Sequence, residues 1–218
     1  MKKQHDVRID RSLLHPRLDF LVEKLLEQCA KKGIYLIITE GFRTKAYQDT
    51  LYAKGRTAPG KVVTNAKGST YSSQHMWGIA FDIAINDTKL LYDGGMLKKV
   101  AKIAKDLGLG WGGDWTSIVD TPHFYLKKWG STTSKLKQLY GTPEKFKKMW
   151  YKTTTYSKNG GLPFWKNKKN INKTKYCRIP KGKKVGILLD TVIKVGSKEY
   201  QKVSYNGKYG YVNTSYLK

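Results

Sequence analysis

The residue pattern changes near residue 157, and this change limits the folds that the chain can adopt. Before it, helical and strand-like segments alternate. After it, short β-type runs are separated by turn residues, and Asp190 and Glu199 are the only acidic residues. One periodic pattern does not cover both parts, so we expect two domains, 1–131 and 157–218. The lysine-rich segment 132–156 is typical of a helix followed by a linker.

The first part of the chain mixes helix and strand signals. Apolar residues recur at helical spacing after Pro16 and stop at Gly33, and further helices are expected at 45–54 and 96–107. Strand-like runs lie at 34–39, 79–85 and 123–126. No phosphate-binding βαβ pattern accompanies them, so we expect an α+β domain.

The second part is expected to be a small all-β domain. Asn206-Gly207 between two apolar runs is a strong hairpin signal. Several short strands in about sixty residues favour a small barrel. The five expected strands are 176–179, 184–189, 192–195, 200–205 and 209–212.

The charge balance predicts an anionic partner. The chain has 42 basic and 16 acidic residues, a formal net charge of +26. Nucleic acid, anionic lipid and the anionic polymers of a Gram-positive cell wall all fit this charge, and charge alone does not choose among them. No arginine-rich helix or nucleic-acid motif organises the lysines.

Membrane and export signals are not evident in the sequence. No apolar run approaches the roughly 18 residues that a membrane span needs. The first 14 residues are charged and have no apolar run, so we expect no signal peptide and synthesis in a cytoplasm.

Asp82 is the one charge in the apolar run 76–85. On an alternating strand it shares a face with Ala80 and Ala84. An isolated charge on a buried face is costly unless it is paired or binds metal, and a solvent-facing strand side is the alternative. His75 precedes Asp82 by seven residues, and a turn at Gly78 would let the two side chains converge.

His123 follows Asp120-Thr-Pro at the start of a strand-like run. Pro122 forces the residue before it to be extended, which lets Asp120 sit at a loop tip. Three ligands with a carboxylate nearby are what a catalytic zinc site needs. Spacing alone leaves a metal site and ordinary structural roles both open.

Three segments in order resemble a known peptidase family. Residues 73–82, Ser-Gln-His-Met-Trp-Gly-Ile-Ala-Phe-Asp, resemble the S-x-H-x-x-G-x-A-x-D signature of VanY-type D-Ala-D-Ala carboxypeptidases and L-alanyl-D-glutamate peptidases. Residues 111–115 with 120–124, and residues 40–44 with Gln48, resemble two further segments of that family. The resemblance covers roughly residues 34–127.

The resemblance implies a fold, a cofactor and site residues. The fold would be a short antiparallel sheet with packed helices, as in D-Ala-D-Ala peptidases and hedgehog-like domains. One Zn²⁺ would be bound, with Asp120 as general base and Arg43 holding the scissile carbonyl and its developing oxyanion. The zinc ligands would be His75, Asp82 and His123, and the substrate-binding residues Ser73, Gln48 and Trp115.

The segments look most like the endopeptidase branch found in phage endolysins, which cleaves the L-Ala-D-Glu bond of the stem peptide. A D-Ala-D-Ala carboxypeptidase on the same fold is one alternative, and a non-catalytic basic wall-binding protein is another. The expected partners are peptidoglycan and anionic wall polymers rather than nucleic acid, with the chain a monomer. The protein would reach the wall after another protein opens the membrane.

The tail resembles bacterial SH3-like domains. Residues 207–212, Gly-Lys-Tyr-Gly-Tyr-Val, followed by Tyr216-Leu217, resemble their closing G-x-x-G-W-V…Y-L segment, with Tyr211 where Trp is usual. The resemblance implies that residues 157–218 form a barrel that binds the cell wall. A small β domain with a purely structural role is the alternative.

Overall fold

The computed structural model describes residues 4–218, apart from the side chains of Asn170 and residues 189–191. It divides into two compact units, Met1–Phe146 and Lys147–Lys218. The division falls inside 132–156, the segment predicted to be a helical linker. Helix α4 (Ser134–Tyr140) and most of α5 (Pro143–Lys147) therefore belong to the first unit.

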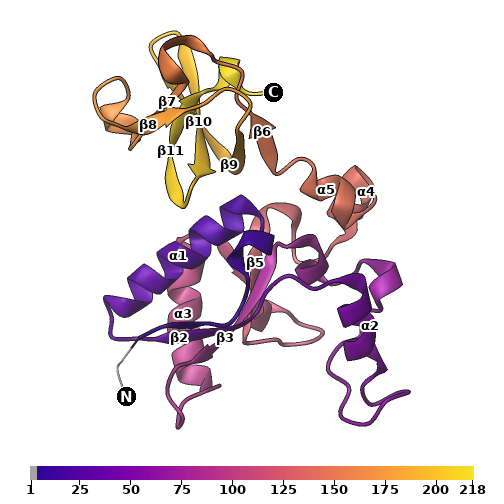
Figure 1. Cartoon of the computed structure of the whole chain (residues 1–218). Coiled ribbons are helices and arrows are strands. Elements are labelled where there is room, and N and C mark those ends of the chain that lie inside the picture. The colour runs from indigo at the N-terminus through magenta and orange to yellow at the C-terminus, as the bar shows by residue number, and fades with distance from the viewer. Residues whose placement is uncertain (1–3) are drawn as a thin grey trace. The chain divides into compact units, whose positions relative to one another are not determined.

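A five-stranded sheet forms the centre of the first unit (Figure 1). Its order is β1-β2-β3-β5-β4; β1 is parallel to β2, and the other neighbours are antiparallel. The three predicted strands correspond to β2, β3 and β5, whereas β1 and β4 are too short to leave a periodic pattern. The strands are β1 (Asp6–Val7), β2 (Leu36–Glu40), β3 (Ala80–Ile85), β4 (Leu109–Trp111) and β5 (His123–Leu126).

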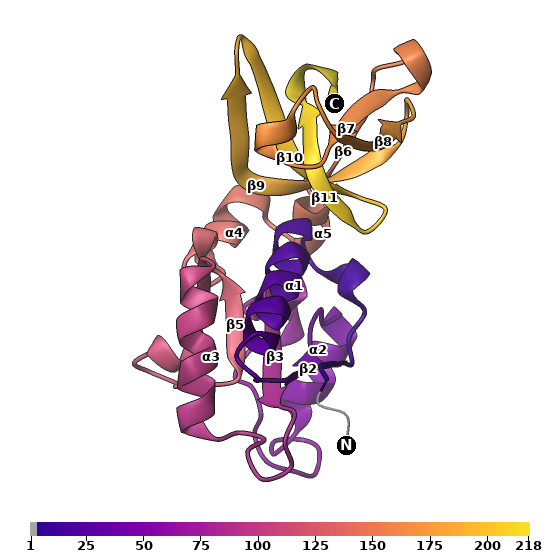
Figure 2. The same ribbon diagram turned by 90° about the vertical axis from the view of Figure 1, so that its left-hand side faces the viewer.

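Helices α1 (Pro16–Ala30) and α3 (Gly94–Asp106) lie side by side over one face of this sheet (Figures 1 and 2). Helix α1 begins where the sequence predicts, with Pro16 in its first turn. Nδ1 of His15 caps it by accepting a hydrogen bond from the backbone N–H of Arg17 at 3.0 Å. The predicted apolar stripe of α1, from Leu18 to Cys29, is buried.

Helix α2 (Lys45–Ala53) lies apart from this pair and confirms the prediction for 45–54 (Figure 1). Thr44 caps it, since its side chain accepts a hydrogen bond from the Tyr47 backbone N–H. Short 3-10 turns connect the elements of this unit: η1 (Arg11–Leu13), η2 (Gly68–Thr70), η3 (Gln74–Trp77), η4 (Gly112–Asp114) and η5 (Lys127–Trp129).

The central strand β3 has two chemically different faces. Phe81 and Ile83 are fully buried on one face, where Phe81 stacks on Phe124 of β5 with ring centroids 5.7 Å apart. Ala80, Asp82 and Ala84 alternate with them on the other face. The predicted placement of Asp82 between two small residues is therefore confirmed, and the sheet supplies a rigid base for the side chains beside it.

The second unit is a six-stranded antiparallel sheet in the order β6-β9-β10-β11-β7-β8. Its core consists of Leu162, Phe164, Ile179, Val185, Ile187, Val203 and Val212. The strands are β6 (Tyr151–Thr153), β7 (Leu162–Trp165), β8 (Lys175–Ile179), β9 (Lys184–Val195), β10 (Lys198–Tyr205) and β11 (Lys208–Asn213).

The strand prediction for this unit was partly wrong. The expected strands 184–189 and 192–195 form one strand, β9, and a register shift between Gln201 and Val203 of β10 accommodates the irregular pairing. Strands β6 and β7 were not predicted, because β6 is mostly exposed and Pro163 weakens the strand pattern of β7. Over the residues that the structure describes, β6 and β8 do not pair, so a closed barrel is not seen and the SH3-like class stays a prediction.

The predicted hairpin at Asn206-Gly207 is confirmed. The two residues connect β10 to β11 with φ angles of 47° and 68°. Both angles lie in the left-handed region that a two-residue type I′ hairpin turn requires, and Asn and Gly are the residues that adopt it most easily. Residues 4–218 contain no helix with the length and apolar character needed to cross a lipid bilayer.

The buried cap of α1 predicts a loss of stability in acid. Burial lowers the pKa of His15 to about 3, and the charges of Lys128 and Arg17 act in the same direction. Below pH 6.5 the unfolded chain protonates this histidine and the folded chain does not, so the free energy of unfolding falls as the pH falls. From pH 7 to pH 5 this histidine alone should remove roughly 2 kcal/mol.

Urea unfolding of the wild type and of His15→Asn at both pH values measures this contribution. Asparagine keeps a capping acceptor and does not titrate. We expect the wild type to lose about 2 kcal/mol more than the variant between pH 7 and pH 5. Equal losses would show that His15 is not held neutral by the fold.

Candidate metal centre and cleft

Three polar side chains form one row across the first sheet. In the strand register Glu40 of β2 lies opposite Asp82 of β3, and Asp82 lies opposite His123 of β5. Residues that pair across antiparallel strands project from the same face, so the row concentrates two carboxylates and an imidazole. The row ends in the cleft rather than in the apolar core, because Phe81 and Phe124 occupy the opposite face.

His75 reaches the same point from the turn that precedes β3. It lies in η3, which ends at Gly78 with φ 63°. This left-handed angle reverses the chain at little cost only for glycine, and it brings the chain back into β3. The predicted turn at Gly78 is thus confirmed, and His75 and Asp82 converge although they are seven residues apart.

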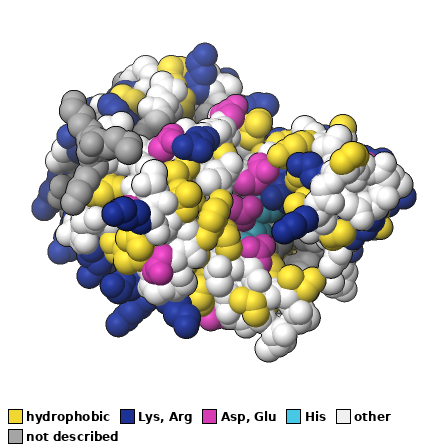
Figure 3. Space-filling view, turned by 90° about the horizontal axis from the view of Figure 1, so that it is seen from below, with side chains coloured by type: hydrophobic (Ala, Val, Ile, Leu, Met, Phe, Trp, Pro, Cys, Tyr) yellow, Lys and Arg dark blue, Asp and Glu magenta, His cyan; other side chains and the backbone are white. Residues whose placement is uncertain are grey.

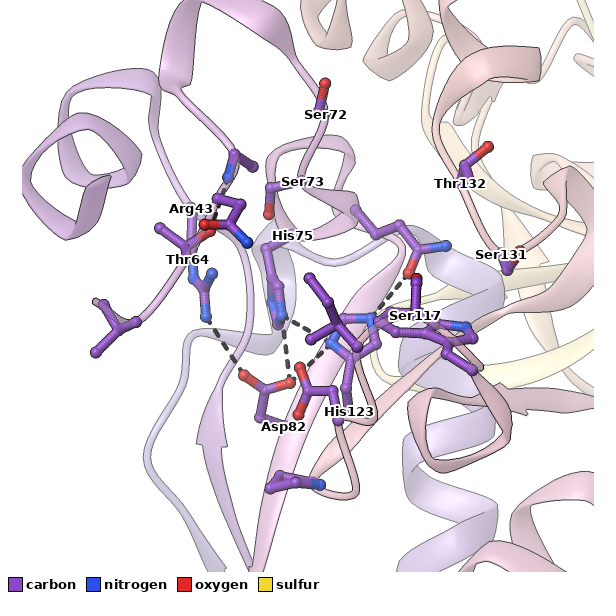
Figure 4. A pocket seen from close by; sticks show the side chains of 18 of the residues that line it. Arg43, Thr64, Ser72, Ser73, His75, Asp82, Ser117, His123, Ser131 and Thr132 are labelled. Carbon is purple, nitrogen blue, oxygen red and sulfur yellow. Dashed lines mark hydrogen bonds and ion pairs between the residues drawn. The ribbon is translucent and has the colours of Figure 1, made fainter. Parts of the chain in front are cut away.

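His75, Asp82 and His123 meet in a buried cluster (Figure 4). Oδ1 of Asp82 lies 3.2 Å from Nε2 of His75 and 3.0 Å from Nδ1 of His123. The two imidazole nitrogens are 3.2 Å apart. Both histidine side chains are at most 6% exposed. The structure therefore brings together the three residues that the sequence predicted as metal ligands.

The chemistry of these atoms fits a bound cation. Nδ1 of His75 lies 2.7 Å from the carbonyl oxygen of Gly41, which only accepts hydrogen bonds. The ring therefore carries its hydrogen on Nδ1 and directs the lone pair of Nε2 toward the Asp82 carboxylate. A lone pair facing a carboxylate is unfavourable without a proton or a cation between them. Two imidazole nitrogens and one carboxylate oxygen form a donor set that zinc accepts.

Asp82 is ionised in this environment. Burial alone would raise its pKa, but the adjacent imidazoles of His75 and His123 outweigh burial and hold the pKa well below its usual range. Burial lowers the pKa of His123, while the adjacent Asp82 carboxylate opposes that change. An anionic carboxylate between two imidazoles strengthens the case for a cation at this point.

Arg43 joins the two carboxylates of the row. Nη2 lies 3.3 Å from Oδ2 of Asp82, and Nε lies 3.3 Å from Oε2 of Glu40. Like charges directly opposite in a sheet repel, and the guanidinium between them offsets that repulsion. Arg43 also occupies the second oxygen of Asp82, which leaves Oδ1 directed at the two histidines (Figure 4).

The cluster opens into a cleft of about 1040 Å³. Figure 3 shows the histidines at the bottom of a hollow, with acidic and basic side chains around them. Residues 62–66 and 72–74 line the cleft, as do Trp115, residues 116–118 and, farther along the chain, Ser131 and Thr132. The cleft lies at the upper end of the size range of ligand-binding pockets and can hold part of an extended peptide.

Asp120 lines the same cleft beside the cluster. Its backbone N–H donates to the Gly112 carbonyl oxygen at 3.1 Å, and its own carbonyl accepts from the His123 N–H at 3.2 Å. Burial raises the pKa of its carboxyl; His123 opposes this change, and the charge of Asp82 adds to it. A raised pKa makes the carboxylate a stronger proton acceptor at neutral pH.

The other predicted site residues differ in position. Trp115 lines the cleft, with its ring 5.1 Å from that of His123, and Nε1 donates to the Tyr125 hydroxyl at 3.3 Å. Ser73 also lines the cleft, and its side chain does not cap the turn that follows. Both are therefore placed where a substrate would pass.

Gln48 does not line the cleft and is fully buried. Its Nε2 donates to Oγ1 of Thr64 at 3.2 Å and to the Ala66 carbonyl at 2.8 Å. It thus holds the wall formed by 62–66 from behind, and the expectation of direct substrate contact does not match this position. The sequence placed Gln48 on a helix but gave no sign of which loop packs over it.

Two contacts to the histidines were missed in the sequence, those of the Gly41 carbonyl and of Gln74. Oε1 of Gln74 lies 2.8 Å from Nε2 of His123. Backbone carbonyls carry no sequence signal, and Gln74 is separated from His123 by 49 residues. The position of Gln74 next to His75 was the one sequence feature that could have suggested a role at the site.

Comparison with known proteins agrees with this geometry. A family profile described as D-alanyl-D-alanine carboxypeptidase matches residues 66–126, which include the three clustered residues and Asp120. The peptidoglycan L-alanyl-D-glutamate endopeptidase CwlK of Bacillus subtilis (strain 168) is 42% identical over 124 residues, or 52% of this chain and 73% of that protein. An L-alanyl-D-glutamate peptidase of a Listeria phage is 34% identical over 116 residues, or 50% of this chain and 37% of that protein.

Among solved structures, the L-Ala D-Glu endopeptidase ChiX of Serratia marcescens is similar, with a TM-score of 0.42 and 20% identity. The match covers 54% of this chain and 83% of that chain. The identity to CwlK over nearly three quarters of that protein is the strongest of these similarities. With it, the chain belongs to the peptidase family that includes the D-alanyl-D-alanine carboxypeptidases and the L-alanyl-D-glutamate endopeptidases.

Proposed function

We propose that the first unit is a zinc peptidase that hydrolyses the L-Ala-D-Glu bond of peptidoglycan stem peptides. The convergence of His75, Asp82 and His123 at the base of an open cleft carries this proposal. The names of CwlK and of the Listeria phage relative support the choice of bond. The phage origin of the second relative suits a lytic role on a host wall. We propose in addition that the enzyme reaches the wall after another protein opens the membrane.

The metal would be held by Nε2 of His75, Oδ1 of Asp82 and Nδ1 of His123. Zinc bound by three protein ligands acts as a Lewis acid and lowers the pKa of water to about 7. The geometry of the three residues is fixed, because the sheet register and the Gly78 turn determine where each side chain lies.

In this proposal Asp120 transfers the proton and Arg43 stabilises the developing charge. Asp120 accepts the proton of the attacking water and returns it to the leaving amine, a task suited to a carboxylate of raised pKa. Arg43 stabilises negative charge on the scissile carbonyl, and its ion pair with Asp82 fixes the guanidinium for that purpose. Ser73 and Trp115 contact the peptide where it lies in the cleft.

We propose further that residues 147–218 bind the cell wall, as an SH3-like domain with affinity for anionic wall polymers. One cross-strand row supports this: Lys202 of β10 lies opposite Tyr211, Tyr211 opposite Trp165 of β7, and Trp165 opposite Lys175 of β8. Trp165 follows Phe164 in β7, and Tyr211 precedes Val212 in β11. Phe164 and Val212 point into the core, so the row faces away from it.

A second cluster of the same kind lies around Tyr176. The ammonium groups of Lys166 and Lys208 lie 5.6 and 5.3 Å from its ring centroid. Glu199 is the one acidic side chain that the structure describes in this unit, and it pairs with Lys194. Lysines that flank aromatic rings without acidic neighbours suit an anionic polymer with a carbohydrate or polyol backbone.

Mass spectrometry of digested peptidoglycan tests the reaction. We expect new N-terminal D-Glu or its amidated form, abolished by EDTA and restored by zinc. Release of free D-Ala instead would favour the carboxypeptidase activity for which the matching family profile is named. No metal-dependent product from several wall types would contradict the catalytic proposal and leave a wall-binding protein.

Replacement of Asp120 tests the division of roles. Asp120→Asn should keep its zinc and lose roughly 100- to 10,000-fold in kcat, because it removes the proton acceptor and leaves the ligands in place. His123→Ala is the matched control and should lose both metal and activity. Zinc content measured by plasma mass spectrometry distinguishes the two. Loss of zinc from Asp120→Asn would make Asp120 a ligand rather than a base.

Charge reversal in the second unit tests the binding role. Lys175→Glu with Lys202→Glu should weaken sedimentation with purified walls by roughly tenfold and reduce its sensitivity to salt. Lys98→Glu with Lys102→Glu, on the exposed face of α3, makes the same charge change in the first unit and should leave wall binding nearly unchanged. Hydrolysis of a soluble peptide should be equal in all three proteins. Equal losses of wall binding in both double variants would show that only net charge matters.

A further inference from the structure

Both ring nitrogens of His123 have partners of fixed chemistry. Nδ1 faces Asp82 and His75 within the cluster. Nε2 lies 2.8 Å from Oε1 of Gln74 on the other side of the ring. Gln74 is only 4% exposed and His123 is 5% exposed, so water does not replace either contact readily.

The orientation of the Gln74 amide is determined by a third group. Nε2 of Gln74 donates to the carbonyl oxygen of Gly130 at 3.3 Å. A carbonyl oxygen only accepts hydrogen bonds, so the amide nitrogen faces Gly130 and the amide oxygen faces His123. That oxygen in turn requires a hydrogen on Nε2 of the imidazole. A neutral His123 then carries its lone pair on Nδ1, the atom directed at Asp82 and His75.

We propose that Gln74 is a positioning residue that selects the tautomer of His123 and so enables it to bind the metal. The inference rests on the proposed metal site. His75 has its tautomer set by a backbone carbonyl, that of Gly41, which no substitution removes. Gln74 is therefore a side chain through which the affinity of the site for its metal can be changed.

Without Gln74 the metal-free site has a competing arrangement. The Nε2 hydrogen of His123 would lose its buried acceptor, which is costly. The ring would then favour a hydrogen on Nδ1, where it donates to Oδ1 of Asp82 at the observed distance of 3.0 Å. That bond satisfies both groups internally and competes with the cation. The rings of Trp115 and Tyr125, 5.1 and 5.8 Å from His123, hold its plane but do not distinguish the two tautomers.

Three variants separate this role from a merely structural one. Gln74→Met keeps the volume and removes the acceptor. Gln74→Glu keeps an acceptor toward His123 and gives up the donor toward Gly130. Gln48→Met is the matched control, because Gln48 is also a fully buried glutamine near the cleft and contacts Thr64 and Ala66 rather than a histidine.

Zinc affinity, measured by competition with a chelator, is the first readout. We expect Gln74→Met to lose roughly 10- to 100-fold in affinity, the range found when partners of metal-binding histidines are removed. Gln74→Glu should stay near the wild type, and so should Gln48→Met. Wild-type affinity in a folded Gln74→Met protein would overturn the proposal.

Nitrogen-15 NMR of the histidine rings in metal-free wild-type protein is the second readout. We expect Nε2 of His123 to carry a hydrogen in the wild type, and to lose it in Gln74→Met, where the ring keeps its hydrogen on Nδ1. An Nδ1–H tautomer in the wild type would overturn the proposal even if the variant fails to fold. If the wild type binds no zinc, the metal site itself fails, while the tautomer measurement still decides the role of Gln74.

Discussion

The buried charge of Asp82 is the constraint on which the active unit depends. A largely buried carboxylate on a central strand is unfavourable unless its partners compensate for lost hydration. Arg43 contacts one oxygen, and the two histidines contact the other. Each partner comes from a different part of the chain, so the fold must bring the segment after β2, the turn η3 and strand β5 together around one carboxylate. The metal-binding geometry is a consequence of that requirement.

The sheet makes this arrangement rigid. Glu40, Asp82 and His123 are fixed by strand register, and Phe81 with Phe124 anchors the same strands from the opposite face. Gln48 holds one wall of the cleft from behind through Thr64 and Ala66. Catalytic geometry that rests on strands and buried contacts changes little when a peptide binds, which suits a reaction that depends on fixed positions.

The sequence predicted the parts of the site that have local signals. The lone charge of Asp82 between alanines, the turn residue Gly78 and the Pro122-His123 step each reflect a constraint within a few residues. The ion pair of Arg43 with Asp82 and the hydrogen bond from His123 to Gln74 are contacts across 39 and 49 residues, which local patterns do not contain. The burial of Gln48 was missed for the same reason, because the residues that cover it, Thr64 and Ala66, lie outside its own helix. In the second unit, β6 and β7 are short or contain proline, so neither left a strand pattern.

The most direct test of the account is diffraction from a crystal of the full chain grown with zinc, with data collected on both sides of the zinc absorption edge. We predict one anomalous peak in the first unit, from a zinc ion bonded to Nε2 of His75, Oδ1 of Asp82 and Nδ1 of His123, with Asp120 facing the ion and not bonded to it. A peak elsewhere, or none at full zinc loading, would contradict the claim that this buried cluster is a catalytic metal centre.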